Sequence, residues 1–142
     1  MLFGQDRTQL RRFYCQAWRR FRSGDELQPL ERLVAEVVAI HPEYHSFLEE
    51  EENAAKAEFL PERGETNPFL HLSLHVAIRE QSRSDQPPGI TAVYQRLVSR
   101  LGDVHEAEHR LMERLAETLW TAQRRGVMPD EKEYLEKVKK LL

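Results

Sequence analysis

The sequence has very little cysteine and no long apolar run. Cys15 is the one cysteine among 142 residues, so no internal disulfide can form, and a lone thiol fits a reducing compartment. No stretch approaches the roughly 20 apolar residues that a membrane helix needs. The first residues, MLFGQDRTQL, lack the basic and then apolar run of a secretory signal. We therefore expect a cytoplasmic protein without a membrane partner.

Several motifs that are typical of common enzymatic and binding activities are also absent. The sequence contains no G-x-x-x-x-G-K-[ST], no G-x-G-x-x-G and no G-x-S-x-G, so nucleotide binding and serine hydrolysis have no support. The net charge of −3 does not suit a strongly basic nucleic-acid-binding protein. These absences leave the charged and histidine side chains as the guide to function.

Helical periodicity covers most of the chain, and no alternating strand pattern stands out. The stretches SGDELQP, LPERGET and SRSDQPPG separate the helical segments, Asn67-Pro68 is a helix start, and Gly126 is a helix stop. Pro42 interrupts the second segment, which either kinks there or gives way to a new helix. We predict one all-α domain over residues 1–142, a helical bundle of about five or six helices.

Charge is unevenly distributed along the chain. Residues 1–22 contain six arginines and one aspartate, whereas residues 43–66 contain eight glutamates and two basic residues. The two regions could be solvated faces that attract each other, with the arginines on glutamates such as Glu49 to Glu52. Alternatively, the N-terminal mixture of arginine and aromatic residues could bind RNA or an acidic protein partner. The negative net charge favours the first interpretation.

All six histidines fall into pairs with a spacing of four residues. The pairs are His41/His45, His71/His75 and His105/His109. Random placement would give roughly 0.25 such pairs in a chain of this length. Residues four apart on a helix lie on one face, about 5–6 Å apart at Cβ, so both imidazoles of a pair can reach one metal ion.

The pairs are expected to face the core of the bundle. His71 and His75 share their helical face with Leu74 and Ile78, for example. Buried imidazoles need hydrogen-bond partners, and a metal ion would satisfy many of them at once. Two carboxylates follow a pair by four residues and could bind the ion or orient the rings. The predicted metal ligands are therefore His41, His45, His71, His75, His105 and His109, with Glu49 and Glu113.

The third pair also belongs to an H-E-x-x-H motif, within VHEAEHRLMERLAE at residues 104–117. In zinc peptidases this motif supplies two ligands and a glutamate base, and a third ligand comes from further along the chain. His109 is the last histidine, no strand is expected, and the other two pairs would have no role. We therefore expect Glu106 to be an exposed helix residue or to orient a ligand.

Imidazole ligands suit Zn, Fe, Ni or Cu and do not choose among them. Six imidazoles exceed what one tetrahedral zinc needs, so either two ions bind or some histidines orient others. An open coordination position would allow water to be activated, as in a small metalloenzyme, whereas a closed site would be structural or storage. The alternative is a non-enzymatic interaction protein, in which the arginine-rich helix binds the partner and the histidines form a structural or pH-sensitive seam.

Four stretches resemble an uncharacterised bacterial family, the domain of unknown function 1841. They are FGQDRTQLRRF, HPEYH, TNPFLHLSLHVAIREQ and PPGI, which are distributed between residues 3 and 90. The third stretch is the most specific. The resemblance implies a small, soluble bacterial protein and brings no known activity with it.

Overall fold

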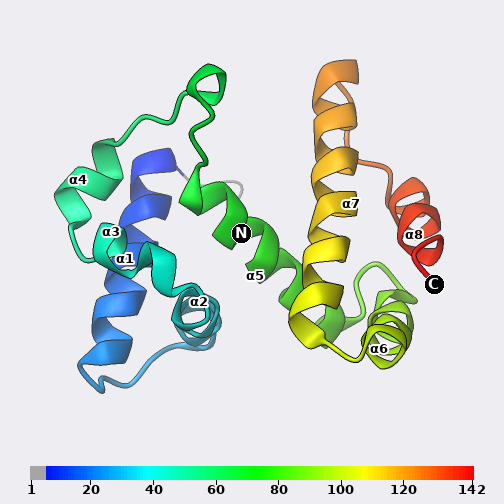
Figure 1. The fold of residues 1–142 in the computed structure, drawn as a ribbon, viewed down its shortest axis with the longest axis horizontal. Helices are drawn as coiled ribbons and strands as arrows, with labels where there is room; N and C mark the ends of the chain where they lie inside the picture. Colours follow the sequence, from blue (N-terminus) through cyan, green and yellow to red (C-terminus); the bar gives the residue numbers. More distant parts are fainter. Residues whose placement is uncertain (1–5) are drawn as a thin grey trace. The chain divides into compact units, whose positions relative to one another are not determined.

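The computed structural model describes residues 6–142, and in this range the chain is all-α, with eight α-helices and no strand (Figure 1). The predicted fold class is confirmed, but the expected five or six helices are too few. The chain divides into two compact units, of which the first ends at Ser73 and the second comprises Leu74–Leu142. Folding of residues 1–142 as one domain stays a prediction.

The first unit begins with α1 (Arg7–Arg22) and α2 (Pro29–Ala39), which pack on each other. The Asp6 carboxylate accepts the backbone N–H groups of Thr8 and Gln9 and so caps α1, whereas Pro29 occupies a first-turn position of α2. The buried residues of the two helices are mainly apolar and recur with helical spacing. They include Tyr14, Ala17 and Trp18 on α1 and Leu33, Val34, Val37 and Val38 on α2.

The additional helices come from the segment after Pro42. That proline begins a 3-10 turn, η2 (Pro42–Tyr44), because α2 has already ended at Ala39. Two short helices follow, α3 (His45–Leu48) and α4 (Glu51–Lys56), and a second 3-10 turn, η3, spans Pro61–Arg63. A new element therefore starts at Pro42, as one of the two alternatives predicts, but it is broken into shorter pieces.

Arg11 departs from the expected pattern, in which the arginines of the first helix all lie on its solvated side. Its side chain is buried, because the guanidinium donates hydrogen bonds to the carbonyls of Ala54, Ala55 and Ala57 at the end of α4. The same guanidinium lies over the ring of Phe69, 5.1 Å from its centroid. Arg11 thus joins α1 to the end of α4 through backbone contacts that periodicity does not reveal.

Helix α5 (Pro68–Ser84) crosses the boundary between the two units as one continuous helix. The Asn67 side chain accepts the backbone N–H groups of Phe69 at 2.9 Å and Leu70 at 3.4 Å, which confirms the predicted start at Asn67-Pro68. The helix carries His71 in its first turns and His75 one turn later. Its start therefore positions two of the predicted ligands.

The second unit contains α6 (Ile90–Leu101), α7 (Val104–Arg125) and α8 (Glu131–Lys139). Gly102 and Gly126 have φ angles of 69° and 66°, so each ends the preceding helix in the left-handed region that glycine tolerates. Asp103 then caps α7 by accepting the Glu106 N–H. The helices enclose an apolar core that includes Leu74, Ile78, Ile90, Val93, Leu97, Leu111, Leu115, Tyr134 and Val138.

Among residues 6–142, no helix combines the length and the apolar character required to cross a membrane.

Candidate metal centre

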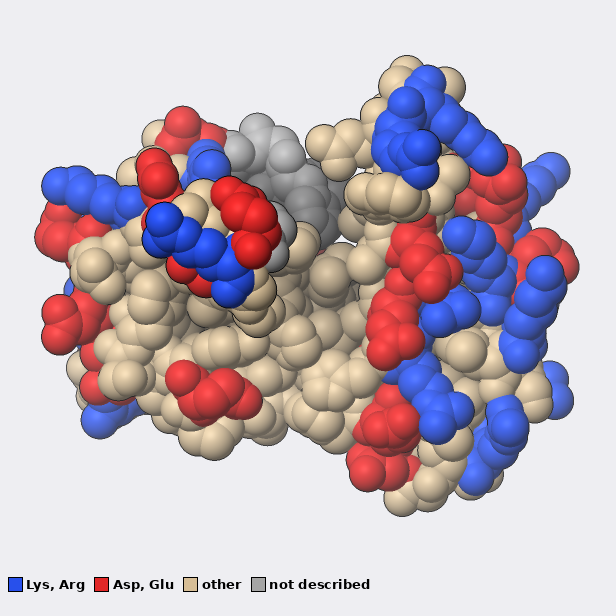
Figure 2. Space-filling model, turned by 45° about the horizontal axis from the view of Figure 1, so that its top comes forward, with Lys and Arg blue, Asp and Glu red and all other residues tan. Residues whose placement is uncertain are grey.

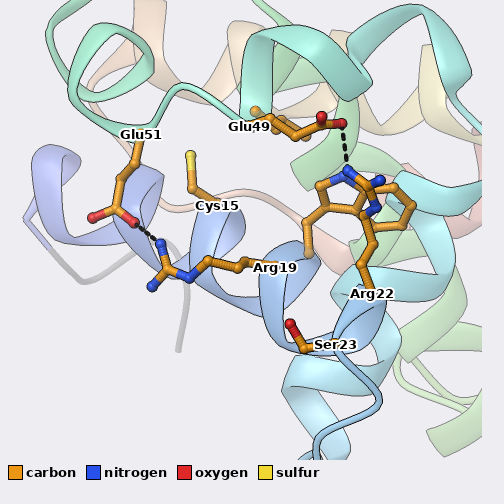
Figure 3. A pocket seen from close by; sticks show the side chains of 8 residues that line it. Cys15, Arg19, Arg22, Ser23, Glu49 and Glu51 are labelled. Atoms are coloured by element: carbon orange, nitrogen blue, oxygen red, sulfur yellow. Dashed lines mark hydrogen bonds and ion pairs between the residues drawn. The ribbon is translucent and has the colours of Figure 1, made fainter.

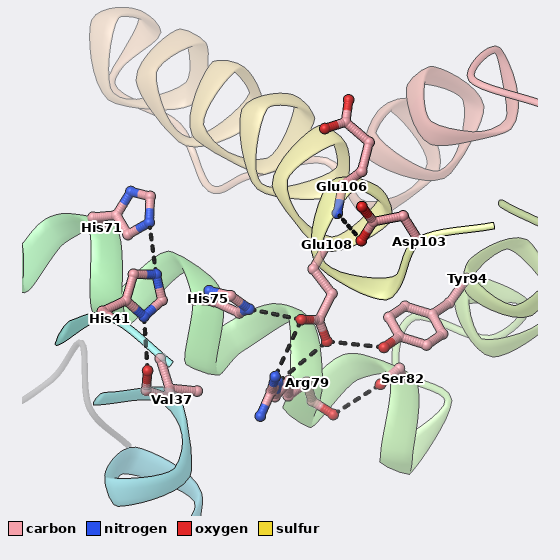
Figure 4. A network of polar contacts seen from close by, with 10 residues as sticks. All are labelled: Val37, His41, His71, His75, Arg79, Ser82, Tyr94, Asp103, Glu106 and Glu108. Carbon is pink, nitrogen blue, oxygen red and sulfur yellow. Dashed lines mark hydrogen bonds and ion pairs between the residues drawn. The ribbon is translucent and has the colours of Figure 1, made fainter. Parts of the chain in front are cut away.

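Two histidines of the first unit face each other at close range. His41 is buried and precedes Pro42, and its Nδ1 lies 2.7 Å from the Val37 carbonyl oxygen (Figure 4). Because a carbonyl only accepts, Nδ1 carries the proton, and the neutral ring then presents a lone pair at Nε2. That Nε2 atom lies 3.1 Å from Nε2 of His71 on α5. The Tyr44 ring stacks on the His41 ring, with centroids 5.7 Å apart, and so covers one face of it.

His75 is fully buried in the second unit and is held by a carboxylate. Its Nε2 atom lies 2.7 Å from Oε1 of Glu108, which projects from α7. The same carboxylate accepts from Arg79 of α5, at 3.1 Å from Nε, and from the Tyr94 hydroxyl of α6 at 2.8 Å. Figure 4 shows these side chains converging on Glu108. A single buried carboxylate therefore links three helices of this unit.

The surroundings of Glu108 keep it ionised. Burial raises its pKa, but the hydrogen bonds from His75, Arg79 and Tyr94 outweigh burial and lower the pKa to about 2. An ionised carboxylate can only accept, so His75 donates from Nε2, and in the neutral tautomer with this proton the lone pair lies at Nδ1. A histidine whose one nitrogen donates to a carboxylate while the other binds a metal is a common arrangement in metal sites.

Two further histidines, both on α7, lie beside His75 of α5. The His109 ring centroid lies 5.5 Å from that of His75, and the His105 centroid lies 5.8 Å from it. His105 and His109 themselves are 4.1 Å apart, as expected for residues one turn apart. His105 is exposed, whereas His109 is partly buried.

Four of the predicted histidines have ring nitrogens close enough to share a metal ion with a neighbour. Within the first unit this holds for His41 and His71, along α5 for His71 and His75, and within the second unit for His75 and His109. In each case one nitrogen of each ring lies within 4.8 Å of the other. Helix α5 therefore carries one member of each unit's pair.

The other predicted ligands have different neighbours in the structure. His45 lies on α3, and its Nε2 is 2.8 Å from the Val38 carbonyl oxygen, while its ring packs on Trp18. Glu49 forms an ion pair with Arg22 at 3.0 Å. The Glu113 side chain is 69% exposed and lies 3.6 Å from Arg114. Glu106 is half exposed and pairs with Arg110, as expected for a helix-surface residue.

Sequence reasoning missed the roles of Glu108 and Arg79. Arg79 follows His75 by four residues, the spacing at which Glu49 and Glu113 follow the other two pairs. In the structure it binds the carboxylate that orients His75. The available signal was that Glu108 shares the apolar side of α7 with Leu111 and Leu115, where a charged residue needs a partner.

The arginines of α1 are engaged with acidic residues of the same unit. Arg12 lies 3.0 Å from Glu51 and 2.8 Å from Glu52, and Arg19 lies 3.2 Å from Glu51. Figure 2 shows the same interspersion of acidic and basic side chains on the surface. These pairs fit the interpretation in which the charged regions attract each other. An RNA or acidic protein partner stays a prediction.

A pocket of about 330 Å³ lies beside these ion pairs (Figure 3). Cys15, Trp18, Arg19 and Arg22 line it, together with the acidic residues that pair with the arginines. Burial and then the nearby Glu51 carboxylate raise the pKa of the Cys15 thiol to about 11, so the thiol is neutral at physiological pH. The pocket therefore holds balanced charges and an unreactive thiol.

Comparison with known proteins identifies the family. The family model described as Domain of unknown function (DUF1841) matches residues 6–140, nearly the whole chain. The chain therefore belongs to this family, as the resemblance of its sequence motifs implies. No curated protein and no solved structure matches it. The family description assigns no activity, so the histidines remain the strongest indication of function.

Proposed function

We propose that the protein binds a transition-metal ion through His41, His71, His75 and His109. The observation that carries the proposal is the 3.1 Å separation of the Nε2 atoms of His41 and His71. Two imidazole nitrogens bound to one tetrahedral zinc, each at about 2.0–2.1 Å, lie about 3.3 Å apart. The two rings therefore already have the spacing of ligands to a common ion.

The groups behind the rings support the same proposal. The Val37 carbonyl fixes the proton of His41 on Nδ1, and Glu108 fixes that of His75 on Nε2. In both rings the opposite nitrogen is left with the lone pair that a metal needs. These partners select one tautomer of each ring and restrict its rotation, so less conformational freedom is lost when an ion binds.

The number of ligands bears on what the ion could do. Four imidazoles fill a tetrahedral shell, so with zinc we propose a closed, structural or storage site. Iron, nickel or copper can accept further ligands, and with one of these a coordination position would remain for water or a substrate. Calcium and magnesium are disfavoured because they prefer oxygen ligands. Whether the protein is an enzyme therefore depends on which ion it binds.

The proposal can be tested by titrating untagged protein with Zn²⁺, Ni²⁺, Cu²⁺ and anaerobic Fe²⁺ against a competing chromophoric chelator. His71→Ala and His75→Ala should each weaken binding of the preferred ion by at least about tenfold, since even outer partners of metal ligands contribute about 10–100-fold. His71→Gln provides a variant of closer volume in case the alanine variant unfolds.

His45→Ala is the matched control, since the His45 ring is bonded to the Val38 carbonyl. It should lose some stability and keep the wild-type affinity for the ion. Circular dichroism would verify that each variant is folded. Binding as tight in folded His71→Gln and His75→Ala as in the wild type would refute the proposed ligand set.

A further inference from the structure

We infer that His105 is the entry ligand of the metal site, which captures the ion from solvent and passes it to His109 and His75. The inference rests on the proposed metal-binding function and adds a route to it. It concerns three histidines of the second unit, His105 and His109 on α7 and His75 on α5.

The three rings form a gradient of exposure. His105 is exposed, His109 is partly buried, and His75 is fully buried. Each ring contacts the other two, with centroids separated by 4.1 Å for His105 and His109, 5.5 Å for His75 and His109, and 5.8 Å for His75 and His105. An ion bound at His105 is therefore within reach of the next ligand before it leaves the first.

The position of His105 on α7 suits transient binding. Asp103 is the N-cap, so His105 is the second residue of the helix. The positive end of the helix dipole disfavours a cation in the first turn, and the Asp103 carboxylate offsets part of this effect. His109 lies one turn further along. Transfer from His105 to His109 thus moves the ion away from an unfavourable field.

The transfer is a sequence of ligand exchanges without a change of oxidation state. The hydrated ion first exchanges one water for a nitrogen of His105. A nitrogen of His109 and then one of His75 each replace a further water, and a water finally replaces the nitrogen of His105. Each step forms one bond to the metal ion as another is lost, so the ion is never without partners in the buried part of the site.

The test compares rates with affinity, using Zn²⁺ as the probe. Stopped-flow mixing with a chromophoric chelator would give the rate of Zn²⁺ uptake, and transfer to excess EDTA would give the rate of release. His105→Ala should slow both by roughly tenfold, which corresponds to a barrier higher by about 1.4 kcal/mol. The dissociation constant should change little, because uptake and release slow together.

Glu106→Gln is the control, because Glu106 is a neighbouring exposed residue that pairs with Arg110. It should leave uptake and release unchanged. Unchanged rates of uptake and release in His105→Ala would overturn the inference. A large loss of affinity for Zn²⁺ in this variant would also overturn it, because His105 would then be a permanent ligand. In both cases the proposed site would still bind Zn²⁺. If the wild type does not bind Zn²⁺, both the proposed site for this ion and the entry route through His105 are refuted.

Discussion

Glu108 shows how one buried carboxylate can organise a site. It is 1% exposed, and the charge of Arg79 and the hydroxyl of Tyr94 make its burial tolerable. Its second role is to hold His75 in one tautomer. The two roles can be separated experimentally, because only one of the three donors to Glu108 is a proposed ligand.

Glu108→Gln should weaken metal binding by about 10–100-fold, as expected when the group that orients a ligand is removed. An amide would offer His75 a weaker acceptor and leave Arg79 without a counter-charge. Tyr94→Phe is the control, because it removes another hydrogen bond to the same carboxylate without touching His75. Chelator competition measures both affinities. A similar loss of affinity in both variants would indicate a general structural effect.

The Cys15 thiol provides a test of local electrostatics in the first unit. Burial and Glu51 raise its pKa to about 11, so about 0.1% of it is ionised at pH 8. Alkylation by iodoacetamide should be slow at pH 8 and should accelerate as the pH rises toward 11. Because the folded state favours the neutral thiol, the free energy of unfolding should also fall between about pH 9 and 11.

Glu51→Gln should lower the pKa of Cys15 and speed its alkylation at pH 8.5, since the Glu51 charge that disfavours the thiolate is removed while Arg12 and Arg19 still favour it. Glu52→Gln, which removes an exposed partner of Arg12, serves as the comparison. Mass spectrometry after timed quenching measures the rates. An alkylation rate in the native wild type equal to that in urea would contradict the burial of this thiol.

At the scale of single residues, the sequence predicted histidines that come together but not the groups that hold them. The i, i+4 spacing is visible without a fold, and it correctly indicates that His71 and His75 share one side of α5. The partners of those rings lie far away in the chain, as Glu108 does from His75, or are backbone atoms such as the Val37 carbonyl. No local pattern can report such contacts.

Among the helices, α5 matters most to the proposed site. Asn67 caps it by accepting two backbone N–H groups, and Asp6 caps α1 in the same way. Asn67→Ala and Asp6→Ala should each lower the free energy of unfolding by about 1 kcal/mol, measured in urea. Only Asn67→Ala should also weaken metal binding, because His71 lies in the first turns of α5. Equal metal affinity in the two variants would show that the start of α5 does not position the metal ligands.

The helix boundaries show where local rules sufficed and where they did not. The caps and stops at Asn67, Asp103 and Gly126 act through nearby backbone groups, so composition predicted them. The pair His41 and His45 has the spacing of a helical pair, yet Pro42 places the first at the end of one element and the second at the start of another. Whether a proline kinks a helix or divides it depends on tertiary packing, which spacing alone does not describe.

For the whole molecule, the all-α class followed from the 3.6-residue period and the lack of strand patterns. The division into two compact units did not, because α5 continues through the boundary without any break in its helical pattern. The sequence gives no linker there to mark it. Each unit has its own buried polar feature, Arg11 on the end of α4 in the first and Glu108 with its donors in the second.

The most direct test of the central claim is the metal content per chain of protein purified without a histidine tag, measured by elemental analysis. We expect about one equivalent of a single transition metal, retained through gel filtration and absent from the His71→Gln/His75→Ala double variant. A metal-free wild-type protein that takes up no Zn²⁺, Fe²⁺, Ni²⁺ or Cu²⁺ on addition would contradict the claim. The histidines would then be a hydrogen-bonded seam.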